Sequence, residues 1–315
     1  MGNEGVRLIS FIIPCFGSEK TLESVVGRVC QTMAPLSYEY EIILVNDCSP
    51  DKVGEVIERL AEDNPRITGV FLARNFGQHA ALLAGMRQGK GDYFICLDDD
   101  GQTSPEEAPK LIAALEAGYD AAYARYGKKM HSSFRNFGSY LNELMLRVLL
   151  GKPKELQVTS YFAVKRFIVQ NIICYEGSYP YVIGLLLRAT RNIANVDVAH
   201  QARLQGRSGY TLVKLISLWM NGFTAFSIIP LRISTVIGIV FACSGFLYGI
   251  YTVIKKFLNP NVPMGFSSMM TAIVFIGGMV MMMLGIIGEY VGRIYLGMNR
   301  APQYVVRNII EHKES

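Results

Sequence analysis

Two long apolar runs near the end of the chain constrain its architecture more than any other feature of the sequence. Residues 233–254 carry no charged side chain, and a second uncharged stretch covers residues 257–288. A helix needs about 20 apolar residues to cross a bilayer, and helices buried in soluble domains are usually shorter. Pro260 and Pro263 mark a turn between the runs. The sequence therefore predicts a hairpin of two transmembrane helices, at about 233–254 and 266–288.

Basic residues orient this hairpin. They gather before the first run and after the second, whereas the connecting loop has only Lys255 and Lys256. The flanking basic residues are Arg203, Arg207, Lys214, Arg232, Arg293, Arg300, Arg307 and Lys313. Loops rich in Lys and Arg stay in the cytoplasm, so both ends of the chain are predicted to be cytoplasmic. The net charge of +5 suits an anionic membrane surface, and no module typical of nucleic-acid binding is present.

The chain before residue 210 has the pattern of an α/β domain. Short apolar runs alternate with segments that have helical spacing. The predicted strands are Leu8–Ile13, Glu41–Val45, Thr68–Leu72 and Tyr93–Leu97, and the predicted helices are Thr21–Met33, Val53–Glu62 and His79–Gly89. This alternation favours a parallel sheet covered by helices. In such sheets ligands bind at the carboxyl ends of the strands, so the residues that follow each strand are the candidates for function.

The end of the fourth strand carries three consecutive aspartates, Asp98, Asp99 and Asp100. Like charges this close disfavour one another's ionisation unless a cation lies between them. Carboxylate oxygens suit Mg²⁺ or Mn²⁺, which bind through one or two carboxylates together with substrate phosphates. The motif alone is also compatible with a solvated acidic turn before a helix. We expect a metal site formed by Asp98 and Asp100, with Gln102 supporting it.

The four strand ends together identify a family. A strand ending at Pro14 with Glu19 five residues later is followed by Val-Asn-Asp-Cys-Ser, Arg-Asn-Phe-Gly-Gln-His and Leu-Asp-Asp-Asp-Gly-Gln. This order resembles the family 2 glycosyltransferases with a GT-A (Rossmann-like) fold. With the hairpin and the run from Gly288 to Tyr295, the chain is similar to the polyprenyl-phosphate glycosyltransferases, which act on undecaprenyl phosphate or dolichyl phosphate. The resemblance covers nearly the whole chain.

The resemblance implies roles for the donor side of the site. Pro14, Phe16, Glu19 and Asp47 would bind the nucleotide sugar, with Asp47 holding the base or ribose. Asp98 and Asp100 would form the DxD pair that meets the donor diphosphate through Mg²⁺ or Mn²⁺, and both count as catalytic together with Gln102. Arg74 would lie near the donor or form a structural ion pair. Uridine is the preferred nucleotide, while the sugar stays open.

The acceptor phosphate needs cations beside the donor's negative charge. Arg125, Arg135 and Arg203 are the candidates, although each could equally be a surface residue. The chain departs from its relatives at Tyr161, which stands where an acidic residue is common, and at Gly209, where a lysine is common. A phosphate acceptor is largely a dianion at neutral pH because its second pKa is about 6, so a strong general base is not required.

These observations predict four segments: a cytoplasmic GT-A domain over 1–210, an interfacial amphipathic helix over 211–230, the transmembrane helices within 231–292 and a cytoplasmic tail over 293–315. The expected reaction is inverting transfer of a sugar from a nucleotide sugar, with UDP preferred, to undecaprenyl phosphate. The resemblance also implies a bacterial inner-membrane protein that is a homo-oligomer, with a tetramer as one candidate state.

Three rival functions fit the sequence less well. A processive polysaccharide synthase shares the fold but usually has a Gln-x-x-Arg-Trp motif, and the sole tryptophan, Trp219, follows Ile-Ser-Leu instead. A non-catalytic membrane scaffold would have no need of Asp98 and Asp100. A nucleotidyltransferase would need a glycine-rich loop with a lysine after the first strand, and none is present.

Overall fold

The computed structural model describes residues 7–126, 153, 155–177, 180–198, 265–298 and 302–312, with scattered positions between 236 and 258. The chain divides into two compact units, one formed by Met1–Leu212 and Arg300–Ser315 and the other by Val213–Asn299. The predicted interfacial helix over 211–230 lies outside the described residues.

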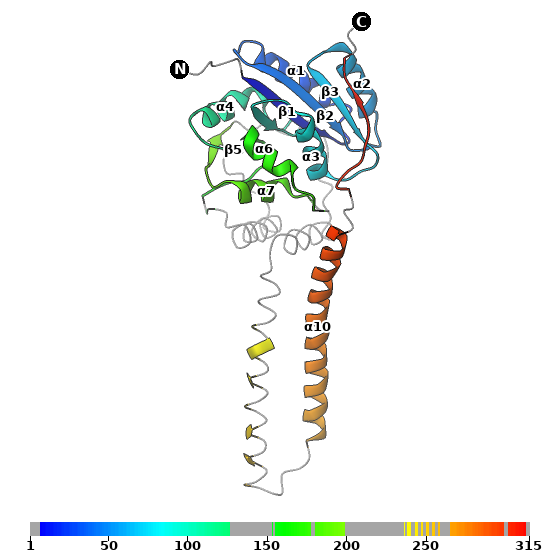
Figure 1. Cartoon of the computed structure of the whole chain (residues 1–315), viewed down its shortest axis with the longest axis vertical. Coiled ribbons are helices and arrows are strands. Elements are labelled where there is room, and N and C mark those ends of the chain that lie inside the picture. The colour runs from blue at the N-terminus through cyan, green and yellow to red at the C-terminus, as the bar shows by residue number, and fades with distance from the viewer. Residues whose placement is uncertain are drawn as a thin grey trace. The chain divides into compact units, whose positions relative to one another are not determined.

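The first unit is built on one mixed sheet of eight strands (Figure 1). The strands are β1 (Leu8–Cys15), β2 (Glu39–Asn46), β3 (Ile67–Leu72), β4 (Tyr93–Cys96), β5 (Ala121–Arg125), β6 (Phe162–Lys165), β7 (Ile193–Asp197) and β8 (Val306–Ile310). Their order across the sheet is β7-β5-β6-β4-β1-β2-β3-β8. Strands β6 and β8 are antiparallel to their neighbours, and the pairs β1–β2, β1–β4, β2–β3 and β5–β7 are parallel. The carboxyl ends of β1 to β4 therefore meet at one edge.

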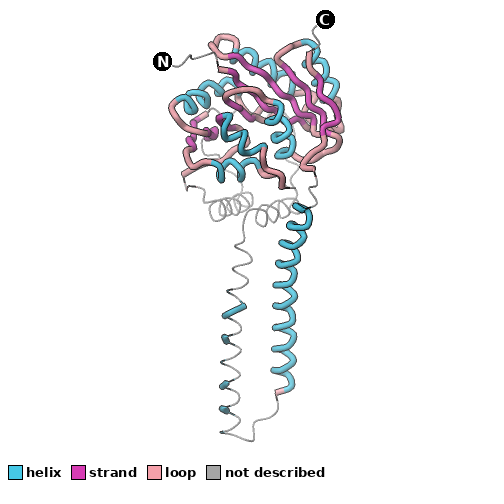
Figure 2. The backbone as a smooth tube through the Cα atoms, in the orientation of Figure 1, coloured by secondary structure: helices cyan, strands magenta, loops and turns pink. Residues whose placement is uncertain are grey.

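Helices cover both faces of this sheet (Figure 2). The helices are α1 (Leu22–Met33), α2 (Val53–Asp63), α3 (Gln78–Gln88), η1 (Pro105–Glu107), α4 (Ala108–Glu116), α6 (Arg166–Ile173) and α7 (Val182–Ala189). The core on one face joins Ile9, Phe11 and Ile13 of β1 to apolar residues of α1, α2 and α4. The alternate residues of β1 point to the other face, because side chains alternate along a strand.

Helix α3 packs unusually close to that other face. A Cβ atom added at Gly85 would lie 2.5 Å from Cγ2 of Ile12 and 3.0 Å from Cγ2 of Val45. Glycine is therefore the residue that lets α3 approach the sheet at this point. The close approach places the first residue of α3, Gln78, beside the end of β4, where its side chain reaches Asp98.

The last strand returns to the sheet after the apolar runs. Strand β8 pairs with β3 at the sheet edge, and the N–H of Ala73 donates to the carbonyl oxygen of Val305 at 2.8 Å. Just before β8, the side chain of Gln303 donates to the carbonyl oxygens of Tyr175 and Gly177. The sequence pattern does not predict β8. The strand has only five residues, some of them charged or polar, and they show little periodicity. The structure thus adds a strand within the predicted tail.

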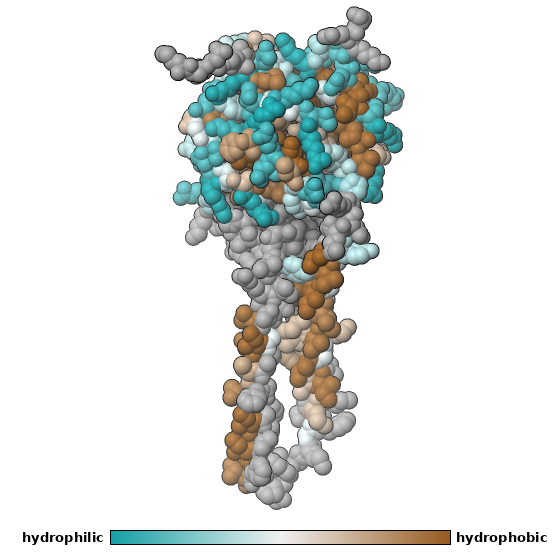
Figure 3. All heavy atoms as spheres, viewed as in Figure 1, coloured by the Kyte–Doolittle hydropathy of each residue, from teal (hydrophilic) through white to brown (hydrophobic). Residues whose placement is uncertain are grey.

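The second unit contains one long described helix, α10 (Phe266–Met298). Its 33 residues span about 50 Å at 1.5 Å per residue, which exceeds the hydrocarbon thickness of a bilayer. Among the described residues it is the one helix long and apolar enough to cross a membrane, with a window at Phe275–Gly292 of mean hydropathy 1.6. Apolar side chains lie on its surface (Figure 3). In the first apolar run the described positions are helical.

Candidate functional site

An acidic turn follows β4, at the edge where the parallel strands end. The side chain of Asp98 is held on both oxygens: Gln78 donates to Oδ1 at 2.8 Å, and the hydroxyl of Ser160 donates to Oδ2. Burial raises the pKa of Asp98, the bond from Ser160 opposes this, and the charge of Asp100 raises the pKa further. The carboxylate is therefore fixed in orientation and placed where negative charge is costly.

The middle aspartate of the turn faces the loop after β1. Oδ2 of Asp99 accepts the backbone N–H of Phe16 at 2.9 Å, and the backbone carbonyl of Asp99 accepts the hydroxyl of Thr21 at 2.7 Å. Burial is the main reason that the pKa of Asp99 rises to about 6. Asp99 thus joins the acidic turn to the loop that holds Phe16, which was predicted to bind the nucleotide.

The third aspartate is positioned by its own turn. Asp100 accepts the backbone N–H of Gln102 at 2.9 Å through Oδ1 and the side-chain amide of Gln102 at 2.7 Å through Oδ2. Gly101 between them has φ +74°, a conformation that disfavours residues with a side chain. The predicted support by Gln102 would act through these two hydrogen bonds to Asp100. A catalytic role for Gln102 stays a prediction.

These carboxylates fit a divalent cation that is shared with a substrate. Within the described part of the chain, no group of three His, Cys, Asp or Glu side chains could hold a metal ion alone. Mg²⁺ and Mn²⁺ at nucleotide sites need only one or two carboxylates, because phosphate oxygens complete the coordination. Asp98 and Asp100 supply two hard ligands at one strand end, and a cation there would offset the cost of burying their charge.

Two of the predicted nucleotide-binding residues sit in or just after β1. Pro14 is buried in the strand and pairs with Val45 of β2. The backbone groups of residues two apart in a strand point to the same side, and the carbonyl oxygen of Ile12 accepts the N–H of Leu97 on the side of β4. The missing N–H of Pro14 therefore faces β4, just beyond Ile12, where the pairing of β1 with β4 ends. Phe16 is 52% exposed, so its ring is available to a ligand.

The other two predicted nucleotide-binding residues already hold loops. A carboxylate oxygen of Glu19 accepts the N–H of Lys52 at 3.0 Å, at the start of α2. Asp47 is buried and accepts the N–H groups of Phe76 and Gly77 at 2.7 and 2.8 Å. Burial raises the pKa of Asp47, and these two bonds oppose the rise. Both residues border the same sheet edge as the acidic turn, and their contact with a nucleotide stays a prediction.

Of the predicted acceptor-binding arginines, the structure describes one. Arg125 forms a two-pronged ion pair with Asp197, with distances of 2.6 and 2.7 Å. Arg135 and Arg203 lie outside the described residues. Arg74 has its guanidinium 4.7 Å from the centre of the Phe76 ring, next to the loop that Asp47 holds.

The structure also brings in residues that the motifs do not reveal. Ser160 and Gln78 contact Asp98, and the carboxylates of Asp98 and Asp100 help to raise the pKa of Tyr126 to about 12, after burial as the larger cause. Tyr161, where the family resemblance led us to expect an acidic residue, is buried, and its hydroxyl donates to the carbonyl oxygen of Ser104 at 3.1 Å. No sequence signal marks Ser160, because a single serine has no pattern.

Comparison with protein families agrees with this geometry. The model of the family described as Glycosyl transferase family 2 matches residues 10–173, and that of the GtrB C-terminal hairpin matches residues 229–294. The first match contains every strand end that forms the acidic turn and its neighbouring loops.

Similar curated proteins match along nearly the whole chain. The undecaprenyl-phosphate 4-deoxy-4-formamido-L-arabinose transferase of Photorhabdus laumondii is 33% identical over 98% of this chain and 96% of its own length. The protein of that name from Proteus mirabilis is 32% identical over 99% and 96%.

Two solved structures share the fold at lower identity. A mycobacterial protein matches with TM-score 0.51 and 18% identity over 69% of this chain and 73% of its own. Glucosyl-3-phosphoglycerate synthase of Mycobacterium tuberculosis, in complex with phosphoglyceric acid, matches with TM-score 0.50 and 20% identity over 70% and 79%.

Proposed function

Because the chain belongs to glycosyl transferase family 2, we propose that it transfers a sugar from a nucleotide-sugar donor to the phosphate of undecaprenyl phosphate. The observation that carries this proposal is the match, over 98% of the chain, to a transferase named for that acceptor. The acidic turn of Asp98, Asp99 and Asp100 supplies the donor side of the chemistry. The protein is a glycosyltransferase, and the donor nucleotide and the sugar are the open parts of the proposal.

The proposed reaction is one displacement at the anomeric carbon. An oxygen of the lipid phosphate forms the new bond to that carbon, the bond to the donor diphosphate breaks, and the configuration inverts. The products are a polyprenyl phosphosugar and a nucleoside diphosphate. When bound, Mg²⁺ or Mn²⁺ would neutralise charge on the departing diphosphate. Asp98 and Asp100 would hold that ion, and the fixed orientation of Asp98 would keep it in register with the donor.

The acceptor does not need a carboxylate base. The second pKa of a phosphate monoester is about 6, so the attacking oxygen is already deprotonated at neutral pH. The burial of Tyr161 supports this proposal, because its hydroxyl is committed to the carbonyl oxygen of Ser104. What the acceptor does need is positive charge, for which we propose Arg125, Arg135 and Arg203. The Arg125–Asp197 pair is largely exposed, so solvent screening leaves Arg125 free to exchange partners.

The membrane assignment is part of the proposal. The hairpin family match over residues 229–294 and the apolar window of α10 support an enzyme held at the bilayer, where its insoluble acceptor resides. We propose that both ends of the hairpin are cytoplasmic, in a bacterial inner membrane, and that the predicted segments 1–210, 211–230, 231–292 and 293–315 describe the organisation. UDP as the nucleotide and a homo-oligomer, with a tetramer as one candidate, complete this proposal.

The decisive experiment measures sugar transfer directly. Purified protein in detergent is given undecaprenyl phosphate and a panel of radiolabelled nucleotide sugars, with Mg²⁺, with Mn²⁺ or with a chelator. We expect one donor to yield a lipid-linked single sugar, with activity lost in chelator and in Asp100→Ala. A ladder of longer products would support a processive synthase instead. Metal-dependent donor binding with no transfer to any polyprenyl phosphate would overturn the acceptor, and no binding of any donor would favour a scaffold.

A further inference from the structure

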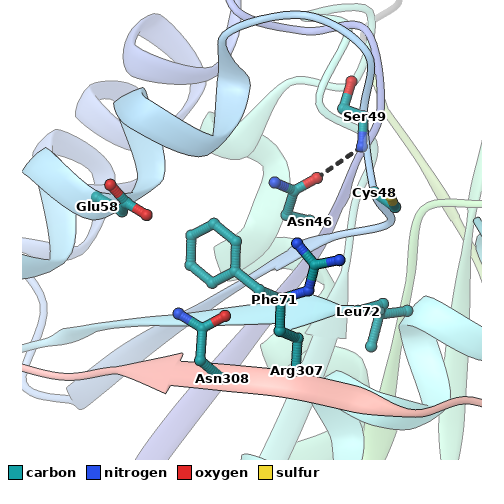
Figure 4. Close-up of a pocket in the computed structure, with 8 residues that line it drawn as sticks. All are labelled: Asn46, Cys48, Ser49, Glu58, Phe71, Leu72, Arg307 and Asn308. Atoms are coloured by element: carbon teal, nitrogen blue, oxygen red, sulfur yellow. Dashed lines mark hydrogen bonds between the residues drawn. The ribbon is translucent and has the colours of Figure 1, made fainter. Parts of the chain in front are cut away.

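Residues 303–305, which we call the strap, join two elements of the first unit just before β8 begins. The carbonyl oxygen of Val305 accepts the N–H of Ala73, after the end of β3, at 2.8 Å. The guanidinium of Arg87, near the end of α3, lies over the ring of Tyr304, 5.5 Å from its centre. Strand β8 then runs along β3 (Figure 4). The strap is therefore fixed both to the sheet edge and to α3.

Gln303 is the residue of the strap that reaches the connection between α6 and α7, of which residues 174–177 and 180–181 are described. Its side-chain amide donates to the carbonyl oxygens of Tyr175 and Gly177, each at 2.7 Å. The guanidinium of Arg87 donates to the carbonyl oxygen of Ile173 at 3.0 Å. Three hydrogen bonds from two side chains therefore hold the backbone where α6 ends.

These bonds leave a buried acceptor without a donor. Oε1 of Gln303 is buried and has no hydrogen-bond partner among the residues that the structure describes. The amide cannot turn round, because only its nitrogen can donate to the two carbonyl oxygens. An unpaired buried acceptor costs about 1–3 kcal/mol, which offsets most of what two neutral hydrogen bonds contribute. The side chain therefore stabilises the fold little, and its main effect is to fix where this backbone lies.

The other end of the connection lies against the residues that hold the acidic turn. Tyr181, just before α7, packs edge-on against the ring of His79, with ring centres 4.8 Å apart and planes at 79°. Burial lowers the pKa of His79 to about 4, so the ring is neutral at pH 7 and the contact is aromatic packing. His79 follows Gln78 in the first turn of α3, and the amide of Gln78 holds Oδ1 of Asp98 at 2.8 Å. Because α3, α6 and α7 pack on one another, a shift at the end of α6 reaches this contact.

We propose that Gln303 is a positioning residue for sugar transfer. It fixes the start of the connection and thereby the place of Tyr181 against His79. That contact keeps the first turn of α3 where Gln78 can orient Asp98. Gln303 lies outside the stretch that matches the glycosyl transferase family model, so that match does not account for it. The inference rests on the proposed function, because it assumes that Asp98 meets the donor through a metal ion.

Gln303→Met in the full chain tests this role, because it keeps the length of the side chain and removes the whole amide. In the transfer assay we expect kcat/KM for the donor, per folded molecule, to fall about 10-fold. The Mn²⁺ concentration for half-maximal transfer should rise about threefold or more, because Asp98 is less firmly oriented. The unfolding temperature should change by less than about 4 °C. Gln170→Met, the same change at an exposed glutamine of α6, is the matched control and should alter none of the three.

Gln303→Glu guards against misfolding of the methionine variant. It keeps the shape of the side chain and sets a carboxylate against the two carbonyl oxygens, so kcat/KM should fall at least as far. Wild-type kcat/KM and Mn²⁺ dependence in both variants overturn this inference alone. A wild-type chain that transfers no sugar from any donor overturns the proposed function, and the inference with it.

A double-mutant cycle separates positioning from a general loss of stability. His79→Ala removes the ring that Tyr181 contacts. If it and Gln303→Met each lower kcat/KM about 10-fold, the double variant should also lose about 10-fold rather than about 100-fold, because both act through one contact. His79→Phe keeps the ring and should retain roughly half or more of the wild-type kcat/KM. Losses that multiply in the double variant overturn the inference, and so does a His79→Phe variant as slow as His79→Ala.

Discussion

Ser160 holds one oxygen of Asp98, and Gln78 holds the other at 2.8 Å. Ser160→Ala would remove one of these donors without changing any charge, so the carboxylate would be free to turn. We expect kcat/KM for the donor to fall about 10-fold, or roughly 1.4 kcal/mol. Steady-state kinetics at saturating acceptor measure this. Thr32→Ala removes a hydroxyl that bonds only to its own helix and should leave kcat/KM unchanged. Equal kinetics in the two variants would contradict the positioning role.

Tyr161 gives the opposite expectation, because its hydroxyl belongs to the interior. Tyr161→Phe removes one of the two donors to the buried carbonyl oxygen of Ser104, which keeps the N–H of Glu107 at 3.0 Å. The free energy of unfolding should fall by about 0.5–1.5 kcal/mol, while kcat per folded molecule stays at the wild-type value. Urea unfolding in detergent and the transfer assay measure the two quantities. A large loss of kcat with unchanged stability would show that the hydroxyl takes part in the reaction.

Residues that are neighbours in the sequence could be placed before the structure, and distant partners could not. Asp98, Asp100 and Gln102 form one short motif, so their common turn follows from chain connectivity. Ser160 reaches Asp98 from 62 positions away. Arg307 stands at a bulge of β8 at the sheet edge, 235 positions after Leu72 of the strand that it borders. A single serine or arginine has no periodicity, so only tertiary pairing reveals these contacts.

At the scale of elements, the seating of α3 on the sheet depends on Gly85. Gly85→Ala would place a Cβ 2.5 Å from Ile12, and relieving that clash should cost about 1–3 kcal/mol of stability. Gly27→Ala on α1 is the matched control, because nothing lies within 4 Å of the added Cβ. That change should stabilise the protein by about 0.5–1 kcal/mol, since alanine favours helix. Thermal unfolding measures both variants. Unfolding temperatures that shift in the same direction in Gly85→Ala and Gly27→Ala would contradict this account.

Strands and helices were predictable where their patterns were strong. The predicted strands 8–13, 41–45, 68–72 and 93–97 fall on β1 to β4, which are buried and rich in β-branched residues. Their parallel pairing follows from the intervening helices. Strands β5 to β8 escaped prediction because no regular alternation of strand and helix patterns marks them in the sequence, and β6 and β8 run antiparallel to their neighbours. Edge pairing is decided by the partner strand, which the local sequence does not contain.

At the scale of the whole molecule, the catalytic unit is assembled from both sides of the hairpin. A chain ending at Leu212 would lack β8 and leave β3 as an open edge. We expect this form to unfold on the order of 5–10 °C below a form in which 1–212 is joined to 300–315 by a flexible linker. The joined form should bind the nucleoside diphosphate, while the truncated form binds it at least about 10-fold more weakly. Calorimetry measures both quantities. Equal unfolding temperatures and equal nucleotide affinities in the two forms would refute this role of β8.

The position of β8 after α10 also sets a timetable for synthesis. Ribosomes add about 5–20 residues per second, so the stretch between Leu212 and Val306 takes roughly 5–20 s to emerge. During that delay the nascent sheet exposes β3 as an unpaired strand, which is a template for aggregation. The last strand can add only after the whole second unit, Val213–Asn299, has been translated. If the proposed membrane assignment holds, the catalytic unit is completed only after the segment that would bring it to its lipid acceptor has been made.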